Sequence, residues 1–176
     1  MKQLPISARI YVGSVIAGGA LLLAAYFPPA LPHPAWFVTL LLLSSITSAF
    51  KVNLPLARSG STMSVSYAVD FLSLILLGPA PTMIVGSLSA WSQCTFRMTT
   101  KNPLYRTLFS MASLIISVQA AGWAFQALGG IPGLSSMSLA AMTRPLLGAA
   151  GAYFVCNTAL IATAIAVSTR QPVLRV

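Results

Sequence analysis

The chain has 176 residues, of which 57% are hydrophobic and only 6% are charged. About a quarter of the residues of an ordinary soluble domain are charged. Ten Lys and Arg residues and a single acid, Asp70, are too few to solvate a water-facing surface of this size. The composition therefore excludes an ordinary soluble domain and indicates a protein whose main solvent is a lipid bilayer.

The net charge of +9 raises the question of nucleic acid binding. A nucleic-acid footprint needs basic residues gathered on one helix or stripe, whereas here they are dispersed over separate short segments. Anionic lipid headgroups are a better match for such dispersed cations. We expect these basic residues to interact with the lipid bilayer and not with nucleic acid.

Six apolar stretches approach or exceed the roughly 20 residues that a transmembrane helix needs. We therefore predict an all-α bundle of six transmembrane helices in one domain, 1–176, with helices at about 8–27, 36–50, 62–77, 82–96, 104–128 and 145–168. The segment 135–143 is predicted to be a separate amphipathic piece at the outer surface. Pro145 then occupies the first position of the last helix, where proline is favoured, and 169–176 is a short tail or the start of a linker.

Lys and Arg residues alternate between the gaps that separate these stretches. Nine of the ten lie before the first stretch or after the second, fourth and sixth: Lys2, Arg9, Lys51, Arg58, Arg97, Lys101, Arg106, Arg170 and Arg175. Short loops rich in Lys and Arg stay in the cytoplasm during membrane insertion. The pattern predicts that both termini are cytoplasmic.

The first stretch could instead be a cleaved signal peptide. Its apolar part is longer than the 7–15 residues usual for such a peptide, and no A-x-A-like cleavage site follows it. Cleavage would leave five crossings and move the last basic segment to the other side. We expect an uncleaved helix.

The segment 62–69 alternates polar or small residues with apolar ones, a period of two that suits a strand. An open strand in lipid would leave backbone groups unpaired at several kcal/mol each. A helix satisfies the backbone and places Thr62, Ser66, Asp70 and Ser73 on one stripe. We favour the helix, expect this third helix to be short or irregular, with an irregular first turn, and keep a shielded strand as the alternative.

Asp70 is the only carboxylate and falls within a predicted crossing, where it is expected to face the bundle interior or a wet cavity. A functional role would make it a proton-linked switch or a contact for a cationic or hydroxylated ligand. A structural role would bond it to Ser66, Ser73 or a neighbouring helix, or pair it with Arg144. Both roles remain open at this point, with the structural one favoured because a lone acid seldom forms a proton path.

Other polar residues complete a tentative ligand-binding set: Ser66, Ser73, Gln93, Gln119 and Asn157 around Asp70. Most such residues in membrane helices serve helix packing. Cys94 and Cys156 lack CxxC or Cys/His spacing, so neither a disulfide framework nor a metal site is expected. With one acid and one His, no general acid–base pair is available, and we expect no enzyme activity and no cofactor.

The stretches LPLARSGSTMSVSYAVDFLSLILLGPAPTMIVGSLSAWSQ at 54–93 and NPLYRTLFSMASLIISVQAAGWAF at 102–125 resemble a known family. This family comprises the bacterial membrane-associated sensor (MASE-like) modules that stand ahead of HD-GYP or GGDEF cyclic-di-GMP signalling domains. The resemblance implies a sensory role in the bacterial inner membrane and carries over no catalytic residues. This chain departs from the pattern because the sequence ends at Val176, before any output domain. We expect either the membrane part of a longer signalling protein or a stand-alone relative.

Two functions follow as expectations. The first is a sensory input module that binds a small molecule or senses the membrane state and relays it to a cytoplasmic signalling domain. The alternative is a substrate-binding membrane subunit of a vitamin or small-solute uptake transporter. A structural membrane partner is a third reading, and a homodimer is left open.

Overall fold

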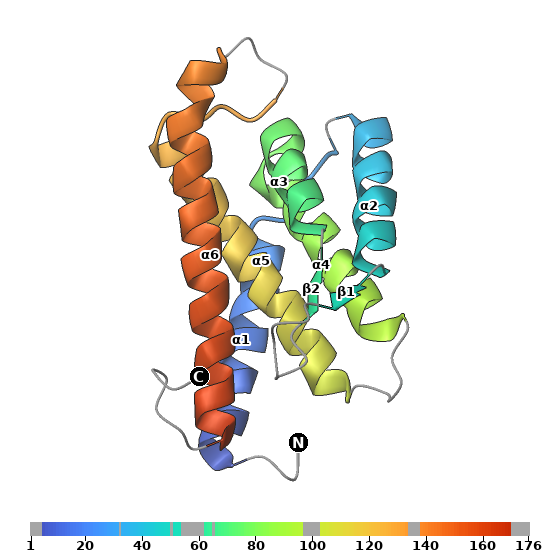
Figure 1. Ribbon diagram of the computed structural model, residues 1–176, viewed down its shortest axis with the longest axis vertical. Helices are drawn as coiled ribbons and strands as arrows, with labels where there is room; N and C mark the ends of the chain where they lie inside the picture. The colour runs from blue at the N-terminus through green and yellow to red at the C-terminus, as the bar shows by residue number, and fades with distance from the viewer. Residues whose placement is uncertain are drawn as a thin grey trace.

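The computed structural model describes residues 5–31, 33–49, 51–53, 62–64, 66–96, 103–133 and 138–169. Within these ranges lie six helices and two short strands (Figure 1): α1 (Ile6–Ala25), α2 (Pro34–Ala49), β1 (Lys51–Asn53), β2 (Thr62–Ser64), α3 (Ser66–Leu77), α4 (Pro79–Thr95), α5 (Leu104–Ala127) and α6 (Leu139–Thr169). The predicted helical architecture is confirmed. Six of the basic residues and the rest of the predicted tail lie outside the described residues. The six are Lys2, Arg58, Arg97, Lys101, Arg170 and Arg175.

Helix α5 is the central element of the bundle. It packs against α4, α6 and α1, while α2 and α3 pack against α4 on the other side (Figure 1). The larger of two apolar cores therefore combines residues from α3, α4, α5 and α6, among them Leu74, Met83, Phe125 and Tyr153. The smaller core joins α2, α3 and α4 through Phe37, Leu40, Val69, Leu77 and Val85.

A very close approach joins α1 to α5. A Cβ atom added to Gly19 would lie 2.7 Å from the Cβ and 2.8 Å from the Cα of Ala112. Aromatic contacts lie on either side of this point, between Tyr11 and Phe109 and between Tyr26 and Trp123. Small residues permit such backbone proximity between membrane helices, so Gly19 fixes how closely the two helices pack.

The predicted turn between the third and fourth helices is present and very short. Gly78 has φ +84°, a conformation that only glycine adopts at little cost, and Pro79 begins α4. The Gly133 amide donates to the carbonyl oxygen of Ile75 at 2.8 Å. This bond attaches the segment after α5 to the end of α3.

The preference for a helix beginning at Thr62 is wrong. Thr62–Ser64 forms β2, which pairs antiparallel with β1 so that Thr62 lies opposite Asn53 and Ser64 opposite Lys51. The period of two indicated a strand correctly only at 62–64, because 66–69, which continue the pattern, lie in α3. Pairing with β1 supplies hydrogen-bonding partners along one edge of β2 and so lowers the expected penalty for an unpaired backbone.

The prediction of a separate piece at 135–143 and of Pro145 at a first helical position is also wrong. Helix α6 begins at Leu139 and continues for 31 residues, with Pro145 inside it; residues 134–137 lie outside the described part. Proline removes one backbone donor, but membrane helices tolerate this when neighbouring groups compensate. Pro145 is fully buried, so the packing around it supports the continuous helix.

Three helices in the described part of the chain are long and apolar enough to cross a membrane, over Ile6–Ala25, Leu104–Ala127 and Ala140–Thr169. Large apolar side chains are exposed on them, such as Phe154 at 66%, which suits a lipid-facing surface. Helices α2 and α3 have 16 and 12 residues. Their lengths of about 24 and 18 Å are shorter than the roughly 30 Å hydrocarbon core.

The direction of the helices brings the beginning of α1 and the end of α6 to the same end of the molecule (Figure 1). In that view α2 descends from the upper end, the strands lie at its foot, and α3 returns upward. The strands lie above the lower ends of α1 and α6. The pair α2–α3 thus enters and leaves the bundle at one end.

Candidate functional site

Asp70 lies inside the bundle, where α3 faces α2 and α4. The residue is only 3% exposed, and its Oδ1 accepts a hydrogen bond of 3.0 Å from the hydroxyl of Ser44 on α2. Ser44 itself is fully buried. The carboxyl group is therefore bonded to a neighbouring helix, one of the partners considered for a structural role.

The other oxygen of the carboxyl group faces α4. A Cβ atom added to Gly86 would lie 3.9 Å from Asp70 Oδ2 and 3.7 Å from Val118 Cγ2. Glycine at this position leaves space next to the acid, between α4 and α5. A larger side chain there would fill the surroundings of Oδ2.

Two further polar contacts connect the same three helices. Ser48 of α2 bonds to Ser89 of α4, and both are buried. The Thr82 hydroxyl lies 3.0 Å from Ser73 Oγ and 2.7 Å from the Gly78 carbonyl oxygen, and it donates toward both. Hydrogen bonds of this kind between membrane helices contribute about 0.6 kcal/mol each on average, so α2, α3 and α4 form a polar-lined unit.

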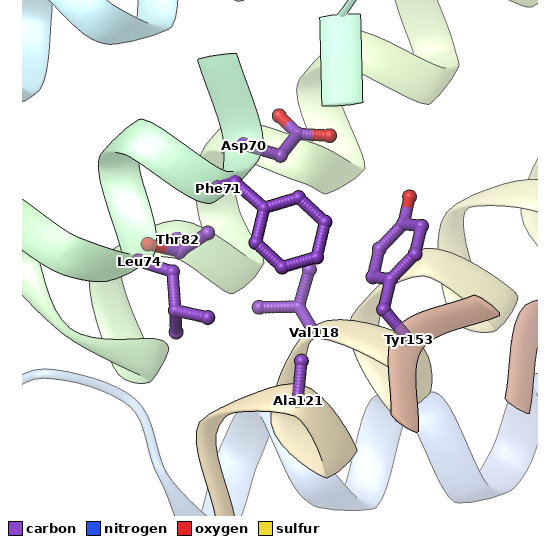
Figure 2. Close-up of a pocket in the computed structure, with 7 residues that line it drawn as sticks. All are labelled: Asp70, Phe71, Leu74, Thr82, Val118, Ala121 and Tyr153. Atoms are coloured by element: carbon purple, nitrogen blue, oxygen red, sulfur yellow. The ribbon is translucent and has the colours of Figure 1, made fainter. Parts of the chain in front are cut away.

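A small cavity opens beside Asp70 (Figure 2). Its volume is about 10 Å³, close to what a single water molecule requires. Four helices line it, through Asp70, Phe71, Leu74, Thr82, Val118, Ala121 and Tyr153. The polar groups facing Asp70 are Ser44 from α2, Thr82 from α4 and Tyr153 from α6, whereas α5 supplies only the apolar Val118 and Ala121.

Tyr153 connects the cavity to α6. Its ring meets Phe71 of α3 edge to face, with centroids 5.3 Å apart. Figure 2 shows the Tyr153 hydroxyl directed toward the end of the cavity where the Asp70 carboxyl lies. A change of charge or hydration at Asp70 therefore occurs in the immediate surroundings of a buried α6 side chain.

The predicted pair of Asp70 with Arg144 is not formed. Arg144 is exposed on α6, and no ion pair joins Asp70 to any residue of the described ranges. Burying a cation against a carboxylate costs several kcal/mol per ion before their attraction is counted. An exposed arginine avoids this cost by remaining at the surface.

Apart from Asp70, none of the predicted site residues is among those that line the cavity. Ser66 and Ser73 are buried on the same helix, and Ser73 bonds to Thr82. Gln93 on α4 and Asn157 on α6 are half-buried, and neither lines the cavity. Gln119 is 2% exposed on α5, and its Oε1 has no hydrogen-bonding partner in the described structure.

Sequence reasoning missed Ser44, Thr82 and Tyr153. Ser44 and Ser48 lie four residues apart and so share one face of α2, a signal that could have identified the side facing Asp70. Thr82 follows the Gly78 turn within one helical turn. Nothing in the local sequence distinguishes Tyr153 from an interfacial aromatic residue, so only the packing reveals its position.

The chemistry available at this site is limited to proton exchange and hydrogen bonding. The cavity contributes one carboxyl group and two hydroxyl groups, and the remaining lining is apolar. Among the described residues, no three His, Cys, Asp or Glu side chains come together in a way that could hold a metal ion.

The chain matches no protein-family model, no curated protein and no solved structure.

Proposed function

We propose that the chain is a membrane-embedded sensory module in which the Asp70 cavity receives the input and α6 transmits it. The observation that carries this proposal is the position of Asp70, the only acid of the chain, in a cavity shared with Tyr153 of α6. An ionisable residue within a membrane domain is a functional candidate by default, because keeping it there is costly.

The Asp70 carboxyl group can exist in two states with different packing requirements. When ionised it needs polar partners, and the hydroxyl donor that the described residues supply, Ser44, satisfies only part of its capacity. When it carries a proton or meets a polar ligand, that need is smaller. A module that senses must bind its input differently in two packings, and a partly satisfied acid between four helices supplies such a difference.

Helix α6 would carry the response toward the cytoplasm. In this proposal the chain is a multi-pass protein of the bacterial inner membrane, and the last turn of α6 lies at the cytoplasmic face, where it would act on a cytoplasmic signalling domain. The basic residues described at that end, Arg9 near the beginning of α1 and Arg106 near the beginning of α5, support this orientation.

The size of the Asp70 cavity favours sensing over solute uptake. A vitamin-sized ligand occupies a pocket of about 300–1,000 Å³, whereas this cavity measures about 10 Å³. In the observed packing it admits an input of the size of a proton or a water molecule. The uptake alternative would require a second packing with a far larger opening next to Asp70.

The two native cysteines allow a direct test of this coupling. Cys94 on α4 and Cys156 on α6 are the only cysteines of the chain, so spin labels attached there report the distance between the two helices. In lipid nanodiscs we expect the distance distribution of the wild-type protein to differ between acidic and alkaline buffer. Asp70→Asn, which cannot ionise, should give one distribution in both buffers.

Ser87→Ala is the matched control, because Ser87 is a buried α4 serine whose hydroxyl bonds, within the described part of the chain, to the Ile84 carbonyl of its own helix. It should respond as the wild type does. A wild-type distribution that is identical in both buffers would contradict the proposal, as would a response that Asp70→Asn retains.

A further inference from the structure

A second, larger cavity is a groove between α1, α5 and α6 at the end of the bundle where α1 begins and α6 ends. Its volume is about 440 Å³, within the range of pockets that hold organic ligands. It is separate from the Asp70 cavity and shares no residue with it. Its lining comprises Val12, Tyr105, Arg106, Phe109, Ser110, Ile161, Ala164, Ile165, Ser168 and Thr169.

The groove has one polar end and one apolar side. Polar groups come from the first turns of α5, with Tyr105, Arg106 and Ser110, and from the end of α6, with Ser168 and Thr169. The apolar lining continues deeper into the bundle along α1 and α6, through Val12, Ile161 and Ala164. Such a division suits a molecule that has a polar headgroup and a hydrocarbon chain.

A hydrogen bond between the walls indicates that the groove is a built feature. The Tyr11 hydroxyl donates to the carbonyl oxygen of Leu160 at 3.1 Å, joining α1 to α6 next to Val12 and Ile161. The Tyr11 ring also contacts Phe109 of α5, with ring centroids 6.4 Å apart. All three helices that form the groove are thereby connected to one another at its apolar end.

The charge at the polar end has no acidic side chain to balance it. Asp70 is the only acid among the 176 residues, and it is buried elsewhere with Ser44 as its donor. The exposed guanidinium group of Arg106 therefore has no carboxylate side chain to pair with. Guanidinium groups bind phosphate through paired hydrogen bonds, and basic pockets between membrane helices on the cytoplasmic side bind acidic lipid headgroups.

We infer that this groove binds one anionic phospholipid, with its phosphate at Arg106 and one acyl chain along Val12, Ile161 and Ala164. The inference does not depend on a sensory role of Asp70. In a chain of net charge +9, such a lipid would place a negative charge at one defined position, in addition to the diffuse attraction between the basic residues and the membrane surface.

The test compares an anionic and a zwitterionic lipid that have the same acyl chains and differ in the headgroup. Full-length protein in detergent is titrated with phosphatidylglycerol or phosphatidylcholine of the same acyl composition, and bound lipid is counted by native mass spectrometry. We expect one phosphatidylglycerol to bind at least about fivefold more tightly than phosphatidylcholine, the factor corresponding to about 1 kcal/mol per basic residue. Arg106→Gln should abolish this preference.

Arg144→Gln is the matched control, because Arg144 is an exposed cation outside the groove, and it should keep the preference. Ala164→Phe retains every charge but fills the apolar part, and it should lower the occupancy of both lipids. Glycerol phosphate, which has the headgroup chemistry without acyl chains, should not displace the bound lipid.

Three results would overturn the inference. The first is equal binding of the two lipids by the wild type, and the second is equal loss of preference in Arg106→Gln and Arg144→Gln. The third is full displacement by glycerol phosphate, which would identify a site for a free phosphate compound. Melting temperatures of the variants show whether each is folded, and if Arg106→Gln does not fold, Ala164→Phe and the competition experiment still decide the outcome.

Discussion

Gly19→Ala is expected to destabilise the protein by about 1–3 kcal/mol, the usual cost of an added methyl group in a packed interior. The new Cβ would lie 2.7 Å from Ala112 Cβ and 2.8 Å from Ala112 Cα. Because the second contact is with backbone, no side-chain rotation can relieve it. Either α1 must move away from α5, or the helices must accept the overlap.

Gly13→Ala is the matched control on the same helix, since a Cβ at Gly13 meets nothing within 4 Å. Alanine is favoured over glycine in a helix interior by about 1 kcal/mol, so this variant should be as stable as the wild type or slightly more stable. The measurement is the midpoint of thermal unfolding in detergent. Equal midpoints for the two variants would show that α1 and α5 do not approach as described.

Ser44→Ala is expected to cost about 1–3 kcal/mol, because it removes the hydrogen-bond donor of a buried carboxyl group. In an Asp70→Leu background the same change should cost close to nothing, since no acceptor remains. The difference between the two costs is the coupling energy of a double-mutant cycle. Unfolding free energies of the four proteins measure it.

Thr47→Ala controls for the loss of a hydroxyl group on the same helix, because the Thr47 hydroxyl bonds, among the residues that the structure describes, to backbone carbonyl groups of α2. It should have little effect in either background.

Asp70→Leu alone is informative as well. Removing the carboxyl group also removes the cost of burying it, so a stable Asp70→Leu protein that has lost its α6 response would assign Asp70 to function.

If Ser44→Ala has the same effect with and without Asp70, the hydrogen bond between them contributes no stability. If Asp70→Leu instead prevents folding, the acid is structural, and the sensory proposal loses the observation on which it rests.

Much of the helical architecture could be predicted because its signals are local. Proline and glycine residues interrupt the apolar stretches, and the predicted helix at 104–128 differs from α5 by a single residue. The turn at Gly78 could be recognised because the glycine–proline sequence disfavours helix continuation there. Such features depend on a few neighbouring residues and require no knowledge of packing.

The predictions that were wrong concern segments whose structure depends on residues distant in the sequence. The strand at Thr62–Ser64 is paired with Lys51–Asn53, and no pattern in the local sequence indicates that partner. Likewise, Pro145 normally indicates a helix start, but surrounding side chains bury it within α6. The position of the Asp70 carboxyl group inside the bundle could be predicted from the energetic cost of exposing it to lipid. Its Ser44 partner and the cavity that it shares with Tyr153 could be found only from the fold.

The short helices α2 and α3 do not alter the expected sidedness of the ends. Because these helices run in opposite directions (Figure 1), two crossings and one re-entrant pair both return the chain to the same side. In the structure the beginning of α1 and the end of α6 lie at the same end of the molecule (Figure 1). The proposed orientation thus rests on the long helices and on the basic residues near their ends.

The central claim is that lipid surrounds this bundle, with the beginning of α1 and the end of α6 both at the cytoplasmic face. Fusions of green fluorescent protein and of alkaline phosphatase to each end of the full chain in bacteria test it most directly. We predict fluorescence and no phosphatase activity for fusions at both ends. Phosphatase activity at either end, or a monodisperse protein purified without detergent, would contradict the account.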